Sequence, residues 1–558
     1  MKHWKFAAAA LALTVALSSS AFACTGMYVG KDVSADGTTI VARSEDISPA
    51  DYNKLQKVQP HVENVPGRFL EDINGFKLPL PDTTYGYTYL SDNSLAGDGL
   101  YAAVCSNEMG VSVTGTVSAS PCAALKEADP FVKQGGLREA VLPAAVAATS
   151  ATAKEGVDNL LKFVDTYGSA EGNIVMIADQ NEAWIVEIYS GHHYAAMKMP
   201  TDAVAVFGNQ FMIGAVDPAA TEGYVFSDGL FAKLDELKLT VKEDGKVLLA
   251  KSVCDKTRSD SSNMRTWIGH TVLAPSSVGE YDTNTFYPLF YKPDQKVSLN
   301  DIIGLYRNRY EGTKYDMLVA GNEAMRPIAV STTPETHIIQ IFDDLPAQYS
   351  SVTWLAMGGG EHAPFLPVWS GVQSVHEGYA VDGQTYNPNS LYWSFKQICG
   401  LADTNRALYS TGVQDFWAVQ ENAMQAKVLA AKETVKTSAD PAAFVTEFSK
   451  NAAQEQLKNA KVLYADLLTT LTHNVGLSAA KTPTTFVANV PLRLAAEQKG
   501  YTVGYANGVV TLTKGDATYS LTVGSKTATG PQGEVKLTSA PYATGGTTYA
   551  PMDFIKGL

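Results

Sequence analysis

Two segments near the start of the chain alternate between apolar and polar positions as β-strands do. Cys24 to Gly30 and Thr38 to Ala42 flank an Asp36-Gly37 turn signal, which predicts a hairpin. Leu100 to Cys105 and Val111 to Val117 predict a second hairpin. Further strands are predicted at Ile174 to Ala178, Ala183 to Tyr189, Tyr194 to Met199, Ala203 to Phe207 and Ser351 to Met357.

Apolar residues at helical spacing predict helices between and after these strands. The shorter patterns are Leu137 to Ser150, Lys154 to Thr166, Gly229 to Leu237, Lys246 to Cys254, Leu299 to Arg309 and Ser390 to Leu401. Two long Ala-rich patterns, Val413 to Ala431 and Asp440 to Thr472, predict long amphipathic helices. Hairpins, then helices, then more strands indicate an α+β fold with helices stacked on sheets.

The composition changes after about Leu477, which marks a domain boundary. Val487 to Ala496 is typical of a short helix, and Gly500 to Gly530 is a run of short strands separated by Gly-containing turns. A chain of 558 residues is also long for a single core. We divide it into a leader (1–23), a main domain (24–480) and a small α+β domain (484–558). A chain ending near residue 480 is expected to stay soluble.

Composition and charge narrow the class of protein. Hydrophobic residues make up 45% and charged residues 18%, values that indicate a folded chain. The net charge of −14 at pH 7 repels phosphate backbones and anionic lipid head groups. Nucleic acid is therefore excluded as a partner.

The N-terminus has the pattern of a secretory signal peptide. Lys2 and Lys5 precede an apolar run from Phe6 to Leu17, and Ala21-Phe22-Ala23 places small residues at −3 and −1. The apolar run is too short to span a bilayer, and no later stretch is long and apolar enough to do so. The sequence therefore predicts export to the periplasm, the cell envelope or the medium, with cleavage before Cys24.

A cysteine at the cleavage point has two specific interpretations and one incidental one. It is either lipidated, as in lipoproteins, or a catalytic nucleophile, or a cysteine without a role. Lipidation favours an aliphatic residue at −3 and a small one at −2, which Ala21 and Phe22 do not supply. As the first residue, Cys24 would carry a thiol of pKa about 8.5 beside an α-amine of pKa about 8. The amine can then act as the base for its own thiol, so no histidine is required.

The remaining cysteines and the histidines leave the redox and metal questions open. The chain has five cysteines and nine histidines. The four cysteines other than Cys24 could form up to two disulfides, or all five could be reduced; they are Cys105, Cys122, Cys254 and Cys399. His192-His193, His362 and His376 show no spacing that requires a metal. We therefore predict no metal and no cofactor.

Several motifs, taken in order, resemble those of a known family. Cys24-Thr25-Gly26, followed by Ala42-Arg43 and Glu45-Asp46, resembles the opening of the family C69 dipeptidases. These are N-terminal-nucleophile hydrolases related to choloylglycine hydrolases and penicillin V acylases. Further matches are Asn107 to Val111, Phe207 to Gly214, Met264 to Trp267, Tyr310 to Asp316, Trp354 to Pro367 and Tyr392 to Phe395. The resemblance covers roughly residues 24 to 470.

This resemblance implies a four-layer αββα sandwich and a role for each of five residues. Cys24 would be the nucleophile, and Arg43 would lie beside its thiolate as a fixed cation. Asp46 would hold the α-amine and orient it as a base. Asn209 would donate an amide N–H to the oxyanion of the tetrahedral intermediate. Arg265 would organise Asp46 and Asn209 or hold a substrate carboxylate.

Two features of the resemblance need separate mention. The related hydrolases place another asparagine after the second hairpin, whereas Gly115 to Ser118 contains none, so a backbone N–H would have to be the second oxyanion donor. The C-terminal domain resembles the copper-amine-oxidase N-terminal-like stalk domain through its closing segment Tyr549 to Ile555. That resemblance implies spacing or surface attachment, and no copper site is evident.

Three functions therefore remain open. The first is an exported cysteine dipeptidase that acts on dipeptides. The second is a bile-salt or penicillin-type amidase of the same superfamily, separated from the first only by its pocket. The third is a non-catalytic envelope lipoprotein. Contact with the cell envelope through the C-terminal domain and assembly into a homo-oligomer are left open as well.

Overall fold

The structure is a computed structural model that describes residues 24–47, 53–255, 258–322, 325–477 and 481–558. The predicted leader, residues 1–23, lies outside the described residues. Within them, no helix combines the length and the apolar character that a membrane crossing requires.

The first sheet carries the N-terminal cysteine. It has six strands in the order β12-β1-β2-β17-β18-β19, and every neighbouring pair is antiparallel. Its strands are β1 (Thr25–Val29), β2 (Thr39–Glu45), β12 (Val204–Phe207), β17 (Glu335–Ile341), β18 (Ser351–Met357) and β19 (Leu366–Trp369). The first strand of the chain is thus internal to the sheet, between β12 and β2.

The second sheet is larger and is built from a different part of the chain. It has eight antiparallel strands in the order β14-β11-β10-β9-β8-β7-β6-β3. They are β3 (Lys54–Gln59), β6 (Tyr87–Asp92), β7 (Val104–Asn107), β8 (Ser112–Ser118), β9 (Asn173–Ala178), β10 (Ala183–Ile188), β11 (Tyr194–Lys198) and β14 (Tyr224–Phe226). Successive hairpins form most of this sheet.

Alternation along β9 shows how the layers stack. Ile174 and Met176 belong to the core shared with the first sheet, whereas Val175 and Ile177 belong to the core beneath a pair of helices. Because side chains alternate across a strand, the larger sheet is buried on both faces. Its inner face packs on the first sheet and its outer face on α2 (Leu142–Thr149) and α3 (Ala153–Tyr167).

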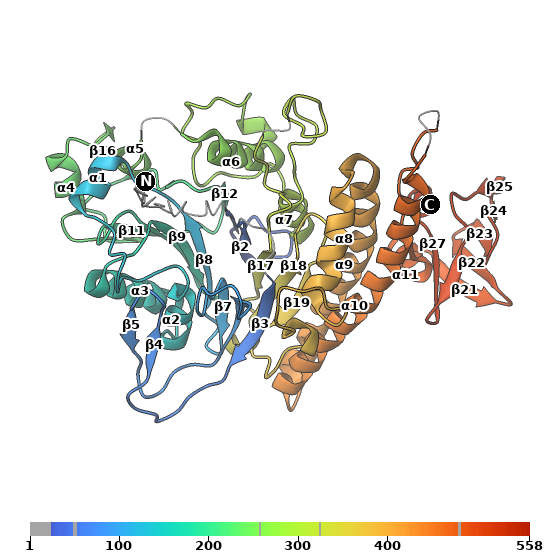
Figure 1. Ribbon diagram of the computed structural model, residues 1–558, viewed down its shortest axis with the longest axis horizontal. Coiled ribbons are helices and arrows are strands. Elements are labelled where there is room, and N and C mark those ends of the chain that lie inside the picture. Colours follow the sequence, from blue (N-terminus) through green and yellow to red (C-terminus); the bar gives the residue numbers. More distant parts are fainter. Residues whose placement is uncertain (1–23, 48–52, 256–257, 323–324, 478–480) are drawn as a thin grey trace, which may run out of the picture.

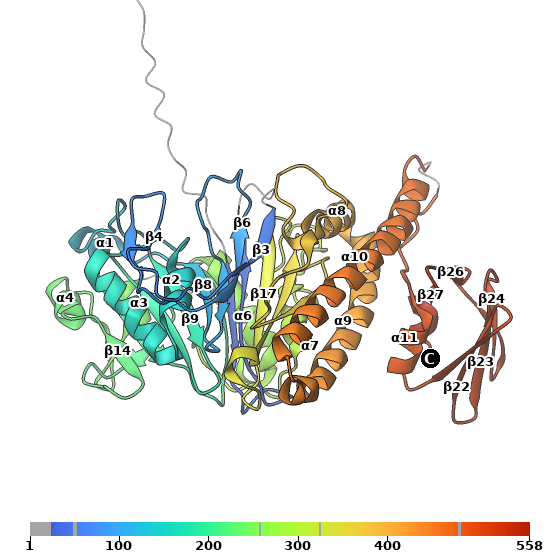
Figure 2. The same cartoon turned by 90° about the horizontal axis from the view of Figure 1, so that it is seen from below.

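Helices also cover the outer face of the six-stranded sheet. They are α8 (Leu391–Asp403), α9 (Arg406–Thr437) and α10 (Pro441–Asn474), which pack against β18 and β19. Figures 1 and 2 show the resulting order of helices, sheet, sheet and helices. The main domain is therefore the four-layer αββα sandwich that the family resemblance implies.

The small C-terminal domain holds two sheets and two short helices. Its elements are β20 (Asn489–Pro491), α11 (Leu492–Gln498), β21 (Thr502–Ala506), β22 (Val509–Lys514), β23 (Ala517–Thr522), β24 (Thr527–Gly530), β25 (Gly533–Lys536), β26 (Tyr542–Thr544), β27 (Thr547–Pro551) and α12 (Met552–Lys556). It lies on the side of α9 and α10 that faces away from the sheets (Figure 2). Phe486 packs directly on Gly412 of α9, and Lys556 pairs with Asp415 at 2.7 Å.

Elements outside the layers connect them or cover their ends. The helices are α1 (Ala123–Ala128), α4 (Leu230–Glu236), α5 (Leu249–Val253), α6 (Asp260–Leu273) and α7 (Leu299–Tyr306), and the short strands are β4 (Phe69–Glu71), β5 (Lys77–Pro79), β13 (Ala215–Val216), β15 (Lys242–Glu243) and β16 (Lys246–Leu248). Of these, α6 matters most for function because it packs on β12 beside the start of β1.

Four predicted elements differ clearly from the structure. The helix predicted over Leu137 to Ser150 begins only at Leu142, and the helix predicted over Val487 to Ala496 begins as strand β20 and is helical only from Leu492. The helix predicted over Lys246 to Cys254 begins as strand β16 and becomes helical only from Leu249 to Val253, because the first three residues pair with β13 and β15. The strand predicted over Leu100 to Cys105 begins only at Val104. Tyr101 has a left-handed backbone (φ 38°), so the chain bends there before it enters the sheet.

Candidate active site

Cys24 lies at the head of β1, in the interior of the sandwich. Its side chain is buried, and the next residue, Thr25, pairs with Ser44 across β1 and β2. Gly26 lies against the ring of Phe207 on β12, and a Cβ there would approach the ring to 2.4 Å. The glycine of the Cys24-Thr25-Gly26 motif is therefore required for β1 to fit between its neighbours.

Arg43 supplies a fixed positive charge beside the thiol. Its Nη2 donates to Sγ of Cys24 at 3.5 Å, and its Nη1 donates to the carbonyl oxygens of Ala103 and Gly115 at 3.2 and 3.0 Å. The side chain is only 1% exposed. Because three acceptors hold the guanidinium, its position is set by the second sheet as well as by β2.

Behind Arg43 lies a buried pair that sequence reasoning missed. Glu335 on β17 is 3.9 Å from Arg43 Nη1, and His337 lies 3.0 Å from Glu335 and 2.7 Å from Thr114 Oγ1. Burial alone would raise the pKa of Glu335, but His337 and Arg43 lower it below its ordinary value. Glu335 and His337 are two positions apart on β17, so their side chains point to the same face of the strand.

Asp46 follows directly after β2 and is 2% exposed. One of its oxygens is 2.6 Å from Nη2 of Arg326, and the other accepts a hydrogen bond from the Thr333 hydroxyl. Its charge contributes to raising the pKa of the Cys24 thiol, so it lies within electrostatic range of that thiol. Arg326 and Thr333 were not among the residues that the sequence indicated.

Arg265, on α6, joins three parts of the site. Its Nη1 donates to the carbonyl oxygen of Cys24 at 2.6 Å and to Thr25 Oγ1 at 3.0 Å. Its Nη2 donates to Oδ1 of Asn209 at 2.9 Å, and its Nε donates to the carbonyl of Ser261 at 2.8 Å. The guanidinium is 1% exposed, and burial lowers its pKa to about 10. These contacts join Arg265 to Asn209 and to the backbone of Cys24.

Asn209 stands between α6 and the end of β8. Its Oδ1 is held by Arg265, and its Nδ2 donates to the carbonyl of Ser118 at 2.8 Å. The stretch where an asparagine was missing, Gly115 to Ser118, contains an irregularity in the β8–β9 register. In the described contacts this stretch supplies two carbonyl acceptors. The carbonyl oxygen of Gly115 accepts from Arg43, and that of Ser118 accepts from Asn209.

The protonation state of Cys24 follows from its surroundings. Burial raises the pKa of the thiol to about 11; Arg43 lowers it, and Asp46, Glu45 and Glu139 raise it. Because Ala23 precedes Cys24 in the sequence, the nitrogen of Cys24 is an amide until the chain is cut there. In the uncut chain the thiol is therefore protonated at neutral pH.

All five cysteines are free thiols in the structure. Among the described residues, Glu361, His362 and Asp403 form a group whose ligand atoms lie within 4.8 Å of one another. Arg406 bonds both carboxylates of this group, from Nε to Glu361 at 3.2 Å and from Nη2 to Asp403. The arginine supplies the positive charge that a metal ion would otherwise bring, so the group is accounted for as an ion-pair network.

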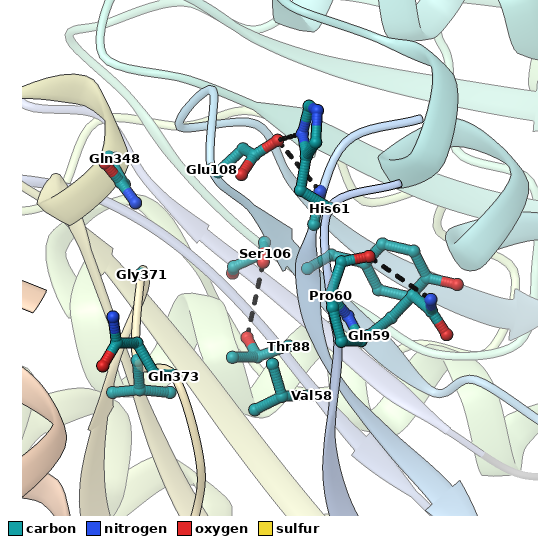
Figure 3. A pocket seen from close by; sticks show the side chains of 13 residues that line it. Val58, Gln59, Pro60, His61, Thr88, Ser106, Glu108, Gln348, Gly371 and Gln373 are labelled. Carbon is teal, nitrogen blue, oxygen red and sulfur yellow. Dashed lines mark hydrogen bonds and ion pairs between the residues drawn. The ribbon is translucent and has the colours of Figure 1, made fainter. Parts of the chain in front are cut away.

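A separate pocket of about 310 Å³ lies between the sheets at the other end of the strands (Figure 3). His61 and Glu108 form an ion pair on one side of it, and Gln348 and Gln373 lie across from them. The pocket is lined by residues at the opposite ends of the strands from Cys24, so it is distinct from the site around the thiol.

Two antiparallel sheets stacked between helical layers, with a cysteine opening an internal strand, define an N-terminal-nucleophile hydrolase fold. The chain belongs to peptidase family C69, whose family model matches residues 23–419. The copper amine oxidase N-terminal domain matches residues 485–557. The protein is accordingly a peptidase.

Curated relatives are consistent with this family, and a solved structure is similar over part of the chain. A probable dipeptidase B from Streptococcus pyogenes serotype M1 is 35% identical over 415 residues, which is 72% of this chain and 82% of the relative. A probable dipeptidase from Latilactobacillus sakei is 29% identical over 453 residues, 80% of this chain and 95% of the relative. The structure of a mutant conjugated bile acid hydrolase from Clostridium perfringens is similar over 60% of this chain and 89% of the hydrolase chain. The identity is 12% and the TM-score is 0.25.

Proposed function

We propose that this protein is an exported cysteine dipeptidase whose nucleophile is Cys24 after the leader has been removed. The observation that carries the proposal is the pair of arginines around one residue. Arg43 donates to the Cys24 sulfur at 3.5 Å, and Arg265 donates to the Cys24 carbonyl oxygen at 2.6 Å. The dipeptidase names of the relatives support the choice of substrate.

Removal of the leader is the activating step in this mechanism. Cleavage before Cys24 turns its amide nitrogen into an α-amine of pKa about 8. This amine takes the thiol proton, and Asp46 and Arg43 then face an ammonium and a thiolate, respectively. A cation beside a thiol lowers its pKa, which opposes the effect of burial.

The reaction then proceeds as acyl transfer. The thiolate attacks the carbonyl carbon of the peptide bond, and Asn209 donates an N–H to the oxyanion. A primary amide carries two N–H groups, so the same nitrogen can donate to Ser118 and to the oxyanion. The ammonium gives its proton to the leaving nitrogen as the C–N bond breaks. Water, deprotonated by the amine, hydrolyses the thioester and restores Cys24.

The test is an assay of the chain that begins at Cys24 against a panel of dipeptides, conjugated bile salts and penicillin V. We expect hydrolysis of dipeptides by the parent protein and none by Cys24→Ala. Preferential hydrolysis of bile salts or penicillin V would favour the amidase alternative. An equally active Cys24→Ala variant would exclude Cys24 as the nucleophile.

Export and processing need a measurement of their own. N-terminal sequencing and intact mass of material released from the producing cell should give a chain that starts with an unmodified Cys24. A mass increased by a diacylglyceryl group would instead support the lipoprotein alternative. Separation of the released material from the cell envelope would also show whether the C-terminal domain keeps the protein at the envelope. Attachment to the envelope is the role we propose for this domain.

A further inference from the structure

Arg326 closes over the carboxylate of Asp46 and remains partly open to solvent. Its Nη2 lies 2.6 Å from Oδ2 of Asp46, and its Nη1 donates to the carbonyl oxygen of Pro327. Asp46 is 2% exposed, whereas the Arg326 side chain is 22% exposed. The Arg326 side chain therefore reaches the surface of the site, whereas the carboxylate beside it is buried.

The loop that carries Arg326 is held by the Tyr310-Glu311-Gly312-Thr313 motif. The Tyr310 hydroxyl donates to the carbonyl oxygen of Arg326 at 2.6 Å. Tyr310 is fully buried and has a left-handed backbone (φ 68°), with its N–H bound to Asn308 Oδ1 at 2.8 Å. A bulky residue in this conformation is strained, and such strain is retained where the surrounding structure fixes it. The motif thus sets the position of Arg326.

Three arginines lie around Cys24 and Asp46 in the part of the chain that the structure describes, and they differ in how far they are exposed. Arg43 is bound to Cys24, Ala103 and Gly115, and Arg265 to Cys24, Thr25, Asn209 and Ser261. Each of these two is only 1% exposed. Arg326 is close enough to Arg265 to help lower its pKa, and its side chain is 22% exposed.

A dipeptide carries a free carboxylate very close to the bond that is cut. Three bonds separate the scissile carbonyl carbon from the carboxylate carbon of the leaving residue, which places them within about 4 Å. A guanidinium fork matches a carboxylate in geometry and charge. Its five N–H groups point along different edges, so one arginine can bridge two carboxylates.

We propose that Arg326 binds the free carboxylate of the leaving residue and thereby selects dipeptides over longer peptides and amides. This proposal rests on the proposed function and names the feature of the substrate that the site recognises. A tripeptide or a dipeptide amide places a neutral amide where the carboxylate would be. The bridge from Asp46 through Arg326 to the substrate then forms only with a dipeptide.

The experiment compares L-alanyl-L-alanine with its C-terminal amide, using the chain that starts at Cys24. We expect the parent protein to favour the dipeptide by about 10- to 100-fold in kcat/KM, as a hydrogen bond between charged groups would give. In Arg326→Gln the ratio should fall toward one, mainly through a higher KM for the dipeptide. Arg326→Lys, which keeps the charge, should retain part of the preference and serves if the glutamine variant does not fold.

Thr333→Val is the matched control. It removes the other hydrogen bond to Asp46 without changing Arg326, so it should lower turnover of both substrates and leave their ratio unchanged. The proposal is overturned if the parent protein does not prefer the dipeptide, or if Arg326→Gln slows both substrates equally. Hydrolysis of neither substrate by the parent protein would instead refute the proposed function.

Discussion

Gly208 lies directly against the guanidinium of Arg265. A Cβ at position 208 would be 2.9 Å from Cζ and from Nη2 of that arginine. The next residue, Asn209, accepts its hydrogen bond from the same Nη2. The glycine therefore allows the arginine and the asparagine to meet, and its role is one of space, because its backbone is not left-handed.

Gly208→Ala should reduce activity without unfolding the protein. The added methyl group displaces Arg265 or Asn209, and misplacement of a catalytic group by about 1 Å can cost about 10²-fold in rate. The measurement is kcat/KM on a dipeptide, with a thermal melt of each variant. Gly214→Ala is the matched control, since a Cβ there meets nothing within 4 Å. Equal loss of activity in both variants would contradict the steric explanation.

Asn209→Ala should lower kcat by about 10²–10³ if its amide stabilises the oxyanion. KM should change little, because the interaction strengthens only in the transition state. A circular dichroism spectrum like that of the parent protein would show that the fold is intact. A folded variant with unchanged kcat would mean that Asn209 serves only to link Arg265 with Ser118.

The sequence predicted the layers of the fold better than it predicted the position of the arginine on α6. The amphipathic patterns for α9 and α10 have one apolar face, so spacing alone identified them. Helix α6 was not predicted, because it is buried on nearly every side from Ser262 to His270 and shows no apolar stripe. Arg265 was found through a motif, and only the structure shows that a helix positions it.

The site itself was predicted in part. Arg43 and Asp46 belong to the opening motif. The structure places Arg43 3.5 Å from the Cys24 sulfur and Asp46 within electrostatic range of the thiol. Glu335 and Arg326 were missed, since their role depends on a strand and a loop that reach the site from almost 300 positions along the chain. No local pattern encodes such pairing, which arises from the order of strands in the sheet.

The thiol of Cys24 should react differently before and after cleavage. In the uncut chain burial raises its pKa to about 11, so alkylation by iodoacetamide should be slow at pH 7 and rise toward pH 11. In the chain that starts at Cys24, the new ammonium should shift this rise to lower pH. Mass spectrometry of tryptic peptides would give the rate at each pH. Identical pH profiles for the two forms would contradict activation by the α-amine.

Glu187 should make stability depend on pH. It is buried beneath the segment that follows Asn209 and accepts hydrogen bonds from the backbone N–H groups of Met212 and Ile213. Burial raises its pKa from 4.5 to about 7. Between these pH values the folded protein keeps a proton that the unfolded chain has released, so stability falls as pH rises through this window. The total effect is about 3 kcal/mol.

Glu187→Gln removes this ionisation while it keeps a side-chain acceptor. The fall in the free energy of unfolding from pH 4.5 to pH 7 should therefore be smaller in the variant than in the parent protein. Urea titrations at several pH values provide the measurement. A variant with the parent's full pH dependence would show that Glu187 does not carry the proton. Buried Glu45 should leave a residual slope, since burial also raises its pKa to about 7.

The C-terminal domain should stabilise the main domain without taking part in the chemistry. Phe486 is buried against Gly412, where a Cβ would lie only 2.5 Å from its ring, and Gln498 donates to the carbonyl of Val419 at 2.8 Å. Deletion of residues 481–558 uncovers this face of α9. The side chains described around Cys24, in contrast, all come from residues before 338.

We therefore expect a chain ending at residue 480 to hydrolyse dipeptides at 25 °C but to melt at a lower temperature than the full chain. Phe486→Ala in the full chain should reproduce much of the loss, at about 3–5 kcal/mol, as truncation of a buried phenylalanine does. Tyr505→Ala is the matched control, because Tyr505 is 58% exposed and should change stability by less than about 0.5 kcal/mol. Calorimetry measures the loss of stability, and kcat/KM on a dipeptide measures the activity that remains. An unchanged melting temperature in the shortened chain would mean that the interface contributes no stability. A shortened chain that folds but is inactive would mean that the C-terminal domain supports the active site directly.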